Sequence, residues 1–178
     1  TSANIYVELI DGGIAVMKLI NLVSLSLFLP LFNLSVAVAE QGSSNLDILK
    51  QHEELSIFLS LVEKINAESQ LQHEDGYITV FAPVNQAFER LDEDVRRKLF
   101  DATDLEFAEK TVQYHVVDGL VFTIGNEPRE TDILTEEGHT LHVVTGGVTV
   151  NNARIIGFDL VSNDGVVHAI DQVLVPLD

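Results

Sequence analysis

The chain has 178 residues, of which 46% are hydrophobic, and this is enough apolar material for one domain with a sizeable core plus an additional segment. Its formal net charge is −18, so nucleic acid and anionic membrane surfaces would both repel it. The chain contains no cysteine, which excludes disulfides, thiolate metal sites, a cysteine nucleophile and a lipidated cysteine anchor.

The N-terminal part of the chain has the pattern of a secretory leader. Met17 and Lys18 precede an apolar run that ends in Ala37-Val38-Ala39. A basic residue, an apolar stretch and an Ala-x-Ala end are typical of a signal peptide, here over 17–39 with cleavage after Ala39. Residues 1–16 would then be an upstream extension to which we assign no function.

An uncleaved N-terminal anchor is the alternative for this leader. The run over 19–39 is uncharged and nominally long enough to span a bilayer. With either outcome we expect the domain, residues 40–178, to face outward. Cleavage would make it secreted, extracellular or periplasmic, with no part left to insert into a membrane.

The first half of the domain is predicted to be mainly helical. Polar residues over 41–45 include helix-capping types, and a helical pattern begins at Leu46. Between 53 and 65 the apolar residues recur at spacings of three and four, which predicts an amphipathic helix with one buried face. Further helices are predicted over 92–100 and from 103 toward Tyr114.

Short strands are predicted between and after these helices. Residues 77–82 are β-branched and aromatic, and Pro83 should end the strand, with Asn85 capping the turn that follows. In the second half the predicted strands cover 116–117, 120–124 and 154–161, together with a hairpin whose arms flank Gly146-Gly147. Helices first and tight-turned strands later favour an α+β fold with a largely antiparallel sheet or sandwich.

The most distinctive stretch is 163–176, near the C-terminus. A turn signal opens it, a β-branched run follows and Pro176 closes it, which predicts a buried strand. His168 and Asp171 are polar residues inside this run, and buried polar groups need partners. Because side chains alternate along a strand, the two should point to opposite faces and cannot jointly hold a metal or share a proton. We expect His168 to be a core imidazole bonded to backbone or carboxylate.

No motif for known chemistry is found in the chain. Phosphate-binding glycine loops, a G-x-S-x-G elbow, an H-E-x-x-H helix and an EF-hand loop are all missing from the sequence. Asp159, Asn163 and Asp164 form only a loose oxygen-rich patch. We therefore predict that the protein is not an enzyme and has no catalytic residue, cofactor or metal.

Three motifs carry a resemblance to a known family. The first is Thr79-Val80-Phe81-Ala82-Pro83, followed by Asn85 and Phe88; the second is Tyr114-His115 ahead of Val116-Val117 and Gly119; the third is the stretch containing Gly165, His168, Asp171 and Pro176. Over about 46–177 the chain resembles the fasciclin (FAS1) family of extracellular adhesion modules. It departs from the family pattern at Val84, Gln86 and Asp164, where Thr, Glu and Asn are usual.

This resemblance implies a fold and a function. The fold would be a wedge-like sandwich of short, mostly antiparallel strands with several helices packed on one side. The function would be non-catalytic adhesion to a cell-surface or matrix protein or polysaccharide. In animal members, integrin binding has been attributed to positions that match Tyr114, His115, Asp159 and Leu160, so these are the implied binding residues. Nucleic acid is not an expected partner, and weak self-association stays open.

Two other functions also stay open from the sequence. The domain could be a small-ligand carrier or enzyme that uses a cleft near His115, which would need apolar walls and converging polar groups. It could also be a purely structural extracellular domain.

Overall fold

The computed structural model describes residues 42–72, 76–101, 103, 105–123, 130–144 and 148–176. The predicted leader over 17–39 and the extension over 1–16 lie outside these residues. In the part of the chain that is described, no helix combines the length and the apolar character that crossing a membrane requires.

Four short helical segments begin the domain: α1 (Asn45–Gln51), the 3-10 turn η1 (Glu53–Leu55), α2 (Ser56–Lys64) and the 3-10 turn η2 (Glu68–Leu71). The polar stretch ahead of α1 does cap it. The Ser44 hydroxyl accepts the N–H of Asp47 at 3.0 Å, and the Asp47 carboxylate accepts the N–H of Ser44 at 3.0 Å, which together form a capping box. The helix predicted over 53–65 is divided between η1 and α2, which share one buried face.

After β1, three helices follow in succession and then the other six described strands. In chain order these elements are β1 (Ile78–Pro83), α3 (Asn85–Glu89), α4 (Glu93–Phe100), α5 (Leu105–Tyr114), β2 (Val116–Asp118), β3 (Glu130–Leu134), β4 (Thr140–Val144), β5 (Thr149–Val150), β6 (Ala153–Val161) and β7 (Gly165–Ile170). On α4 the two arginines form ion pairs, Arg96 with Glu93 and Arg97 with Asp94, while Lys98 lies over the ring of Phe107.

The strands form one seven-stranded sheet in the order β2-β1-β7-β6-β5-β4-β3 among the described residues. Every neighbouring pair is antiparallel except β1 and β7, which run parallel with Phe81 opposite His168. A single bridge between Val117 and Thr135 joins the two outer strands, so the sheet folds over on itself without closing as a barrel. The predicted α+β class and mostly antiparallel pairing are confirmed.

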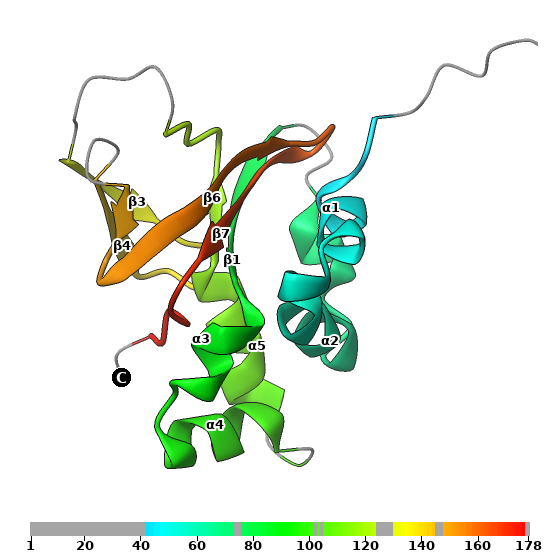
Figure 1. The fold of residues 1–178 in the computed structure, drawn as a ribbon, viewed down its shortest axis with the longest axis vertical. Coiled ribbons are helices and arrows are strands. Elements are labelled where there is room, and N and C mark those ends of the chain that lie inside the picture. The colour runs from blue at the N-terminus through cyan, green and yellow to red at the C-terminus, as the bar shows by residue number, and fades with distance from the viewer. Residues whose placement is uncertain are drawn as a thin grey trace, which may run out of the picture. The chain divides into compact units, whose positions relative to one another are not determined.

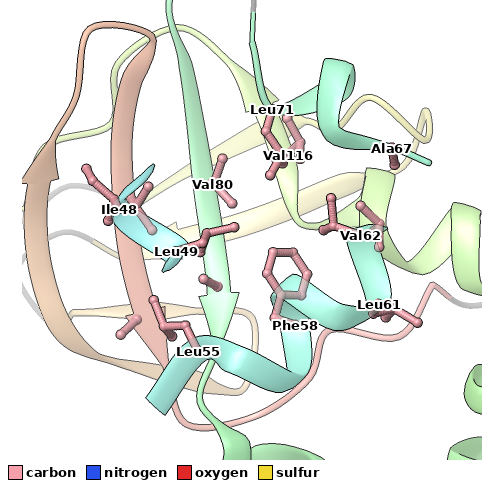
Figure 2. Packing of buried hydrophobic residues seen from close by; sticks show 14 of the residues in the cluster. Ile48, Leu49, Leu55, Phe58, Leu61, Val62, Ala67, Leu71, Val80 and Val116 are labelled. Atoms are coloured by element: carbon pink, nitrogen blue, oxygen red, sulfur yellow. The ribbon is translucent and has the colours of Figure 1, made fainter. Parts of the chain in front are cut away.

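Two apolar clusters fill the domain, one on each face of β1 and β7. Helices α1 and α2 lie along one face (Figure 1), and their inward side chains pack on Val80 and Val167 of the sheet. Figure 2 shows this cluster, with Phe58 of α2 and Leu49 of α1 pointing toward β1. The second cluster lies inside the folded sheet and includes Phe81. Because successive side chains of β1 point to opposite faces of the sheet, this strand contributes residues to both clusters. The result is a sandwich with helices packed on one side.

The strand predicted over 120–124 is not formed by residues 120–123, and Ile124 lies outside the described residues. Side chains take the place of a partner strand there. The Thr79 hydroxyl accepts the N–H of Val121 at 3.0 Å, and the ring of His168 binds the carbonyl of Val121 at 2.6 Å. Because side chains bind the N–H and the carbonyl of Val121, this segment needs no partner strand and follows an irregular path beside β1 and β7.

Asn85 does not cap the helix that it begins, so that prediction is wrong. Val84 holds the N-cap position of α3 and makes no side-chain cap bond. The Asn85 side chain reaches back to η1 and α2 instead, where Oδ1 accepts the N–H of Ile57 at 3.0 Å and Nδ2 donates to the carbonyl of Glu53 at 3.0 Å. Asn85 therefore connects α3 to α2, two helices far apart in the sequence.

Candidate functional site

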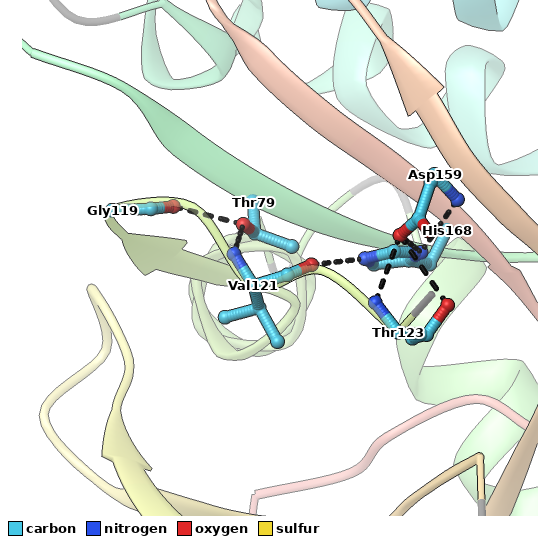
Figure 3. Close-up of polar contacts among 6 residues, drawn as sticks. All are labelled: Thr79, Gly119, Val121, Thr123, Asp159 and His168. Carbon is cyan, nitrogen blue, oxygen red and sulfur yellow. Dashed lines mark hydrogen bonds and ion pairs between the residues drawn. The ribbon is translucent and has the colours of Figure 1, made fainter. Parts of the chain in front are cut away.

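His168 occupies the middle of β7, which lies between β1 and β6 in the sheet. Its Nδ1 accepts the backbone N–H of Asp159 at 3.1 Å, and its Nε2 lies 2.6 Å from the carbonyl of Val121 (Figure 3). A backbone N–H only donates and a carbonyl only accepts, so the ring is neutral with its proton on Nε2. Burial lowers the pKa of His168, against the opposing effects of the Val121 carbonyl and the Asp159 charge. His168 is therefore a buried imidazole bonded to backbone groups, as predicted.

Asp159, one of the implied binding residues, binds Thr123 at the end of the segment over 119–123. Its backbone has a φ of 47°, at an irregular point in the pairing of β6 with β7. Its Oδ1 accepts the N–H of Thr123 at 3.0 Å and the Thr123 hydroxyl at 3.3 Å (Figure 3). The neighbouring Leu160 is only partly exposed and packs against the helix-facing core. Neither side chain extends freely from the surface.

Thr79 completes the same polar network from β1. Its hydroxyl donates to the carbonyl of Gly119 at 2.8 Å and accepts from Val121, as Figure 3 shows. Thr79 is fully buried, so these bonds replace the water that its hydroxyl gives up. Thr79 of the first motif and His168 of the third thus both bind the backbone of the segment over 119–121.

Asp171 follows β7 and has partners on β6 that are separate from those of His168. Its carboxylate accepts the backbone N–H of Arg154 at 2.8 Å and the Arg154 Nε–H at 2.9 Å. Burial by itself raises the pKa of Asp171, but the two bonds from Arg154 and the charges of Arg154 and Arg90 outweigh it, and the net pKa is lowered. As expected, His168 and Asp171 do not form a joint site.

His115 is completely buried at the end of α5. Its Nδ1 donates to the carbonyl of Thr111 at 2.6 Å, and its Nε2 accepts the backbone N–H of Leu174 at 3.0 Å. The ring also packs against Phe58, with 5.4 Å between the centroids. Desolvation lowers the pKa of His115 to about 4, although the Thr111 carbonyl opposes this. Both nitrogens are used and the ring is neutral, so the geometry offers no acid or base to a ligand.

Tyr114 lies beside His115 in the sequence and forms part of a cleft. The cleft has a volume of about 530 Å³ and lies between the start of β4, the Asn151-Asn152 turn and the C-terminal segment over 172–175. The Tyr114 hydroxyl donates to the carbonyl of Thr140 at 3.2 Å and accepts from Asn151 Nδ2 at 3.1 Å. His115 does not line this cleft, so its ring takes no part in the recess that the small-ligand alternative would need.

The remaining motif residues have packing or backbone roles. Phe81 stacks on His168 with ring centroids 5.5 Å apart, Pro83 ends β1 and Phe88 is a buried residue of α3. Gly165 has a φ of 150°, and a Cβ there would lie 1.7 Å from the carbonyl oxygen of Ile78. Pro176 is the last described residue and is partly exposed. Glycine is required at 165 because β1 approaches so closely.

Sequence reasoning missed the polar residues of the cleft, which are Thr140, His142, Asn151, Asn152 and Gln172. The only signal that the sequence offers here is the Asn151-Asn152 pair, which indicates a turn. That turn is present, and Asn151 has a φ of 49°. A turn signal says nothing about which other segment faces it, so the cleft could not be assembled from the sequence. Within the described residues, no cluster of three His, Asp or Glu side chains could hold a metal ion.

Comparisons with known proteins agree on one family. The model of the fasciclin domain matches residues 53–176. Protein sll1483 of Synechocystis sp. is 31% identical over 142 residues, which cover 80% of this chain and 78% of that protein. Human periostin is 33% identical over 141 residues, covering 76% of this chain but only 16% of periostin. Fasciclin-like arabinogalactan protein 12 of Arabidopsis thaliana is 29% identical, covering 80% of this chain and 62% of that protein.

A solved structure has the same fold. It is a FAS1 domain pair from the insect cell adhesion molecule fasciclin I, which superposes with a TM-score of 0.61 at 15% sequence identity. The match covers 75% of this chain and 51% of that one. With the sandwich, the three motifs and the family match in agreement, the chain belongs to the fasciclin family.

Proposed function

We propose that this protein is a non-catalytic binding module that works outside the cell and attaches to a cell-surface or matrix protein or polysaccharide. Residues 17–39 would be its leader and residues 40–178 its fasciclin domain. Membership of a family that includes periostin, fasciclin-like arabinogalactan proteins and an insect cell adhesion molecule supports an adhesive role.

The observation that carries this proposal is the use of the polar motif residues inside the fold. The ring nitrogens of His115 and His168 are bound to backbone groups, and Asp171 is bound to Arg154. General acid–base catalysis needs a group within reach of a substrate and free to exchange a proton. These side chains are already bonded within the fold, so they stabilise it and are not free to exchange a proton with a substrate. Such an arrangement favours a binding function over catalysis.

The implied binding residues fit this scaffold role to different degrees. His115 and Asp159 are bonded internally and Leu160 is partly buried, whereas Tyr114 lines the cleft. We therefore propose that Tyr114 belongs to the binding region. The other three residues, His115, Asp159 and Leu160, would stabilise the fold around it.

A capture experiment tests the proposal. The chain is displayed in several copies per particle, which raises avidity, and is applied to arrays of extracellular matrix proteins and of cell-surface glycans. We expect reproducible, saturable retention by at least one component and no turnover of it. Absence of retention by any component, with the displayed chain shown to be folded, would contradict the proposed function.

A further inference from the structure

The cleft beside Tyr114 differs from the rest of this acidic chain in its charge. None of the residues that line it is Asp, Glu, Lys or Arg, although the whole chain carries 28 acidic and 10 basic residues. The one histidine in the lining, His142, has its Nδ1 2.9 Å from Asp132 of the neighbouring strand. The recess is thus a neutral patch on a strongly negative protein, which disfavours an anionic ligand by long-range repulsion and offers a cation no ion pair inside.

The polar groups of the cleft divide into bound and unbound sets. Asn151 is fixed, because its Nδ2 donates to Tyr114 and its Oδ1 accepts the N–H of His142 at 2.8 Å. Gln172 is held at one end, with Nε2 donating to the carbonyl of Asn152 at 3.0 Å. Among the described residues, no partner exists for the Thr140 hydroxyl, the Asn152 side-chain amide or the Gln172 Oε1. The cleft therefore presents both donors and acceptors on a pre-organised frame.

The rest of the lining is apolar. Ala153 of β6 and the segment Val173, Leu174 and Val175 contribute it. This segment is anchored, since the backbone N–H of Leu174 donates to the buried ring of His115. A ligand for this cleft must accordingly have an apolar surface next to groups that both donate and accept hydrogen bonds, and its net charge should be zero.

We propose that this cleft binds an uncharged sugar unit of a cell-surface or matrix glycan, an inference that rests on the proposed binding function. The C–H surface of a pyranose ring packs on the apolar wall. Its hydroxyls, each a donor and an acceptor, pair with Thr140, Asn152 and Gln172. A volume of about 530 Å³ lies within the usual range for small-ligand sites and accommodates a short stretch of glycan. An extended peptide added as a strand is less well matched, because the β4 residues in the lining pair with β3 on one side, and Asn151 binds the N–H and the carbonyl of His142 on the other.

The test is a titration of the full chain with named probes. These are neutral hexasaccharides of glucose, galactose, mannose or arabinose, the acidic hexagalacturonate, and an uncharged octapeptide rich in valine and threonine. Affinity is measured by calorimetry, and the location of binding by backbone amide shifts in NMR. We expect at least one neutral hexasaccharide to bind, with shifts at Thr140, Asn151 and Gln172, and hexagalacturonate to bind more weakly.

Variants locate the site independently. The double variant Asn152→Ala/Gln172→Ala removes two exposed amides, so it should keep the melting temperature and weaken the sugar roughly tenfold or more. Gln86→Ala removes an exposed amide from α3, outside the cleft, and should leave affinity unchanged.

The outcomes separate this inference from the proposed function. The sugar site is contradicted if a neutral sugar binds the double variant as tightly as it binds the unaltered chain. It is also contradicted if the chain binds only the peptide or a matrix protein. In both cases the proposed adhesive function still holds. If neither the arrays nor these probes retain the folded chain, both proposals fail.

Discussion

The Nε2 of His115 accepts the backbone N–H of Leu174 at 3.0 Å, which fastens the C-terminal segment to the end of α5. The other ring nitrogen, Nδ1, donates to the carbonyl of Thr111, one helical turn earlier. The imidazole thus joins a helix to the segment that forms one wall of the cleft. This bond can exist only while the ring is neutral.

Acid should therefore destabilise the fold through His115. The pKa of the buried ring is about 4, against 6.5 for an ordinary histidine, so the unfolded chain binds more protons between these values. The free energy of unfolding consequently rises with pH across this window, and stability is lost as the pH falls from 6.5 toward 4. At roughly 1.4 kcal/mol per pH unit, the effect amounts to about 3 kcal/mol. Urea denaturation at a series of pH values measures it.

The variant His115→Leu isolates this contribution from the other titrating groups. It retains bulk but leaves the Leu174 N–H without an acceptor, so at pH 7 it should be less stable by roughly 1 to 3 kcal/mol. The stability gap to the unaltered chain should narrow as the pH falls toward 4. A gap that stays constant over this range would show that His115 does not titrate as described.

Removal of the Asn85 side chain should loosen the contact between α2 and α3. Asn85→Ala deprives the Ile57 N–H of its acceptor and the Glu53 carbonyl of its donor, and we expect a loss of about 1 to 2 kcal/mol in the free energy of unfolding. Asn85→Asp keeps the acceptor and places a negative charge at the start of α2, so it should lose clearly less. Equal losses from both variants in urea titrations would argue against a capping role.

Alanine substitutions at Gly165 and at Gly138 together test how closely β1 approaches β7. Both have positive φ angles, 150° and 100°, but a Cβ would meet the Ile78 carbonyl oxygen at 1.7 Å in the first and nothing within 4 Å in the second. Gly138→Ala should cost about 1 kcal/mol of backbone strain. Gly165→Ala must also displace a strand, and we expect roughly 3 kcal/mol or more. Similar melting temperatures for the two variants would contradict this packing.

The fold class was predictable because its signals are local. Helical spacing over 53–65 and the β-branched run over 77–82 each indicate an element without reference to the rest of the chain. The parallel pairing of β1 with β7 has no such signal, since it joins strands from opposite ends of the domain. The same holds for Asn85, whose partners in η1 and α2 become its neighbours only after folding. The strand predicted over 120–124 failed because side chains, not another strand, bind the backbone of Val121.

The candidate site was predictable only in part. Burial of His168 follows from the continuous apolar run around it, which the sequence displays directly, whereas the partners of His168 and Asp171 lie on other segments. The cleft depends on a turn, a strand end and the C-terminal segment meeting in space, and Asn152 and Gln172 are exposed polar residues with no periodic pattern. Proximity of this kind is a property of the fold and cannot be deduced from composition or spacing.

His168 should contribute to stability and not to binding. His168→Ala removes a fully buried ring and leaves the Asp159 N–H and the Val121 carbonyl without partners, which should cost roughly 1 to 3 kcal/mol in urea denaturation. The bonds of Asp159 to Thr123 should persist, because they do not pass through the ring. A change below about 0.5 kcal/mol would contradict a structural role.

The most direct test compares this variant with Asn152→Ala/Gln172→Ala for affinity and melting temperature together, using whichever array component retains the unaltered chain. If the internal polar network holds the fold and the cleft binds the ligand, His168→Ala lowers the melting temperature but keeps its affinity where it is still folded. The cleft variant then keeps its melting temperature and loses affinity. The reverse pattern, in which His168→Ala abolishes binding at an unchanged melting temperature, would contradict the account.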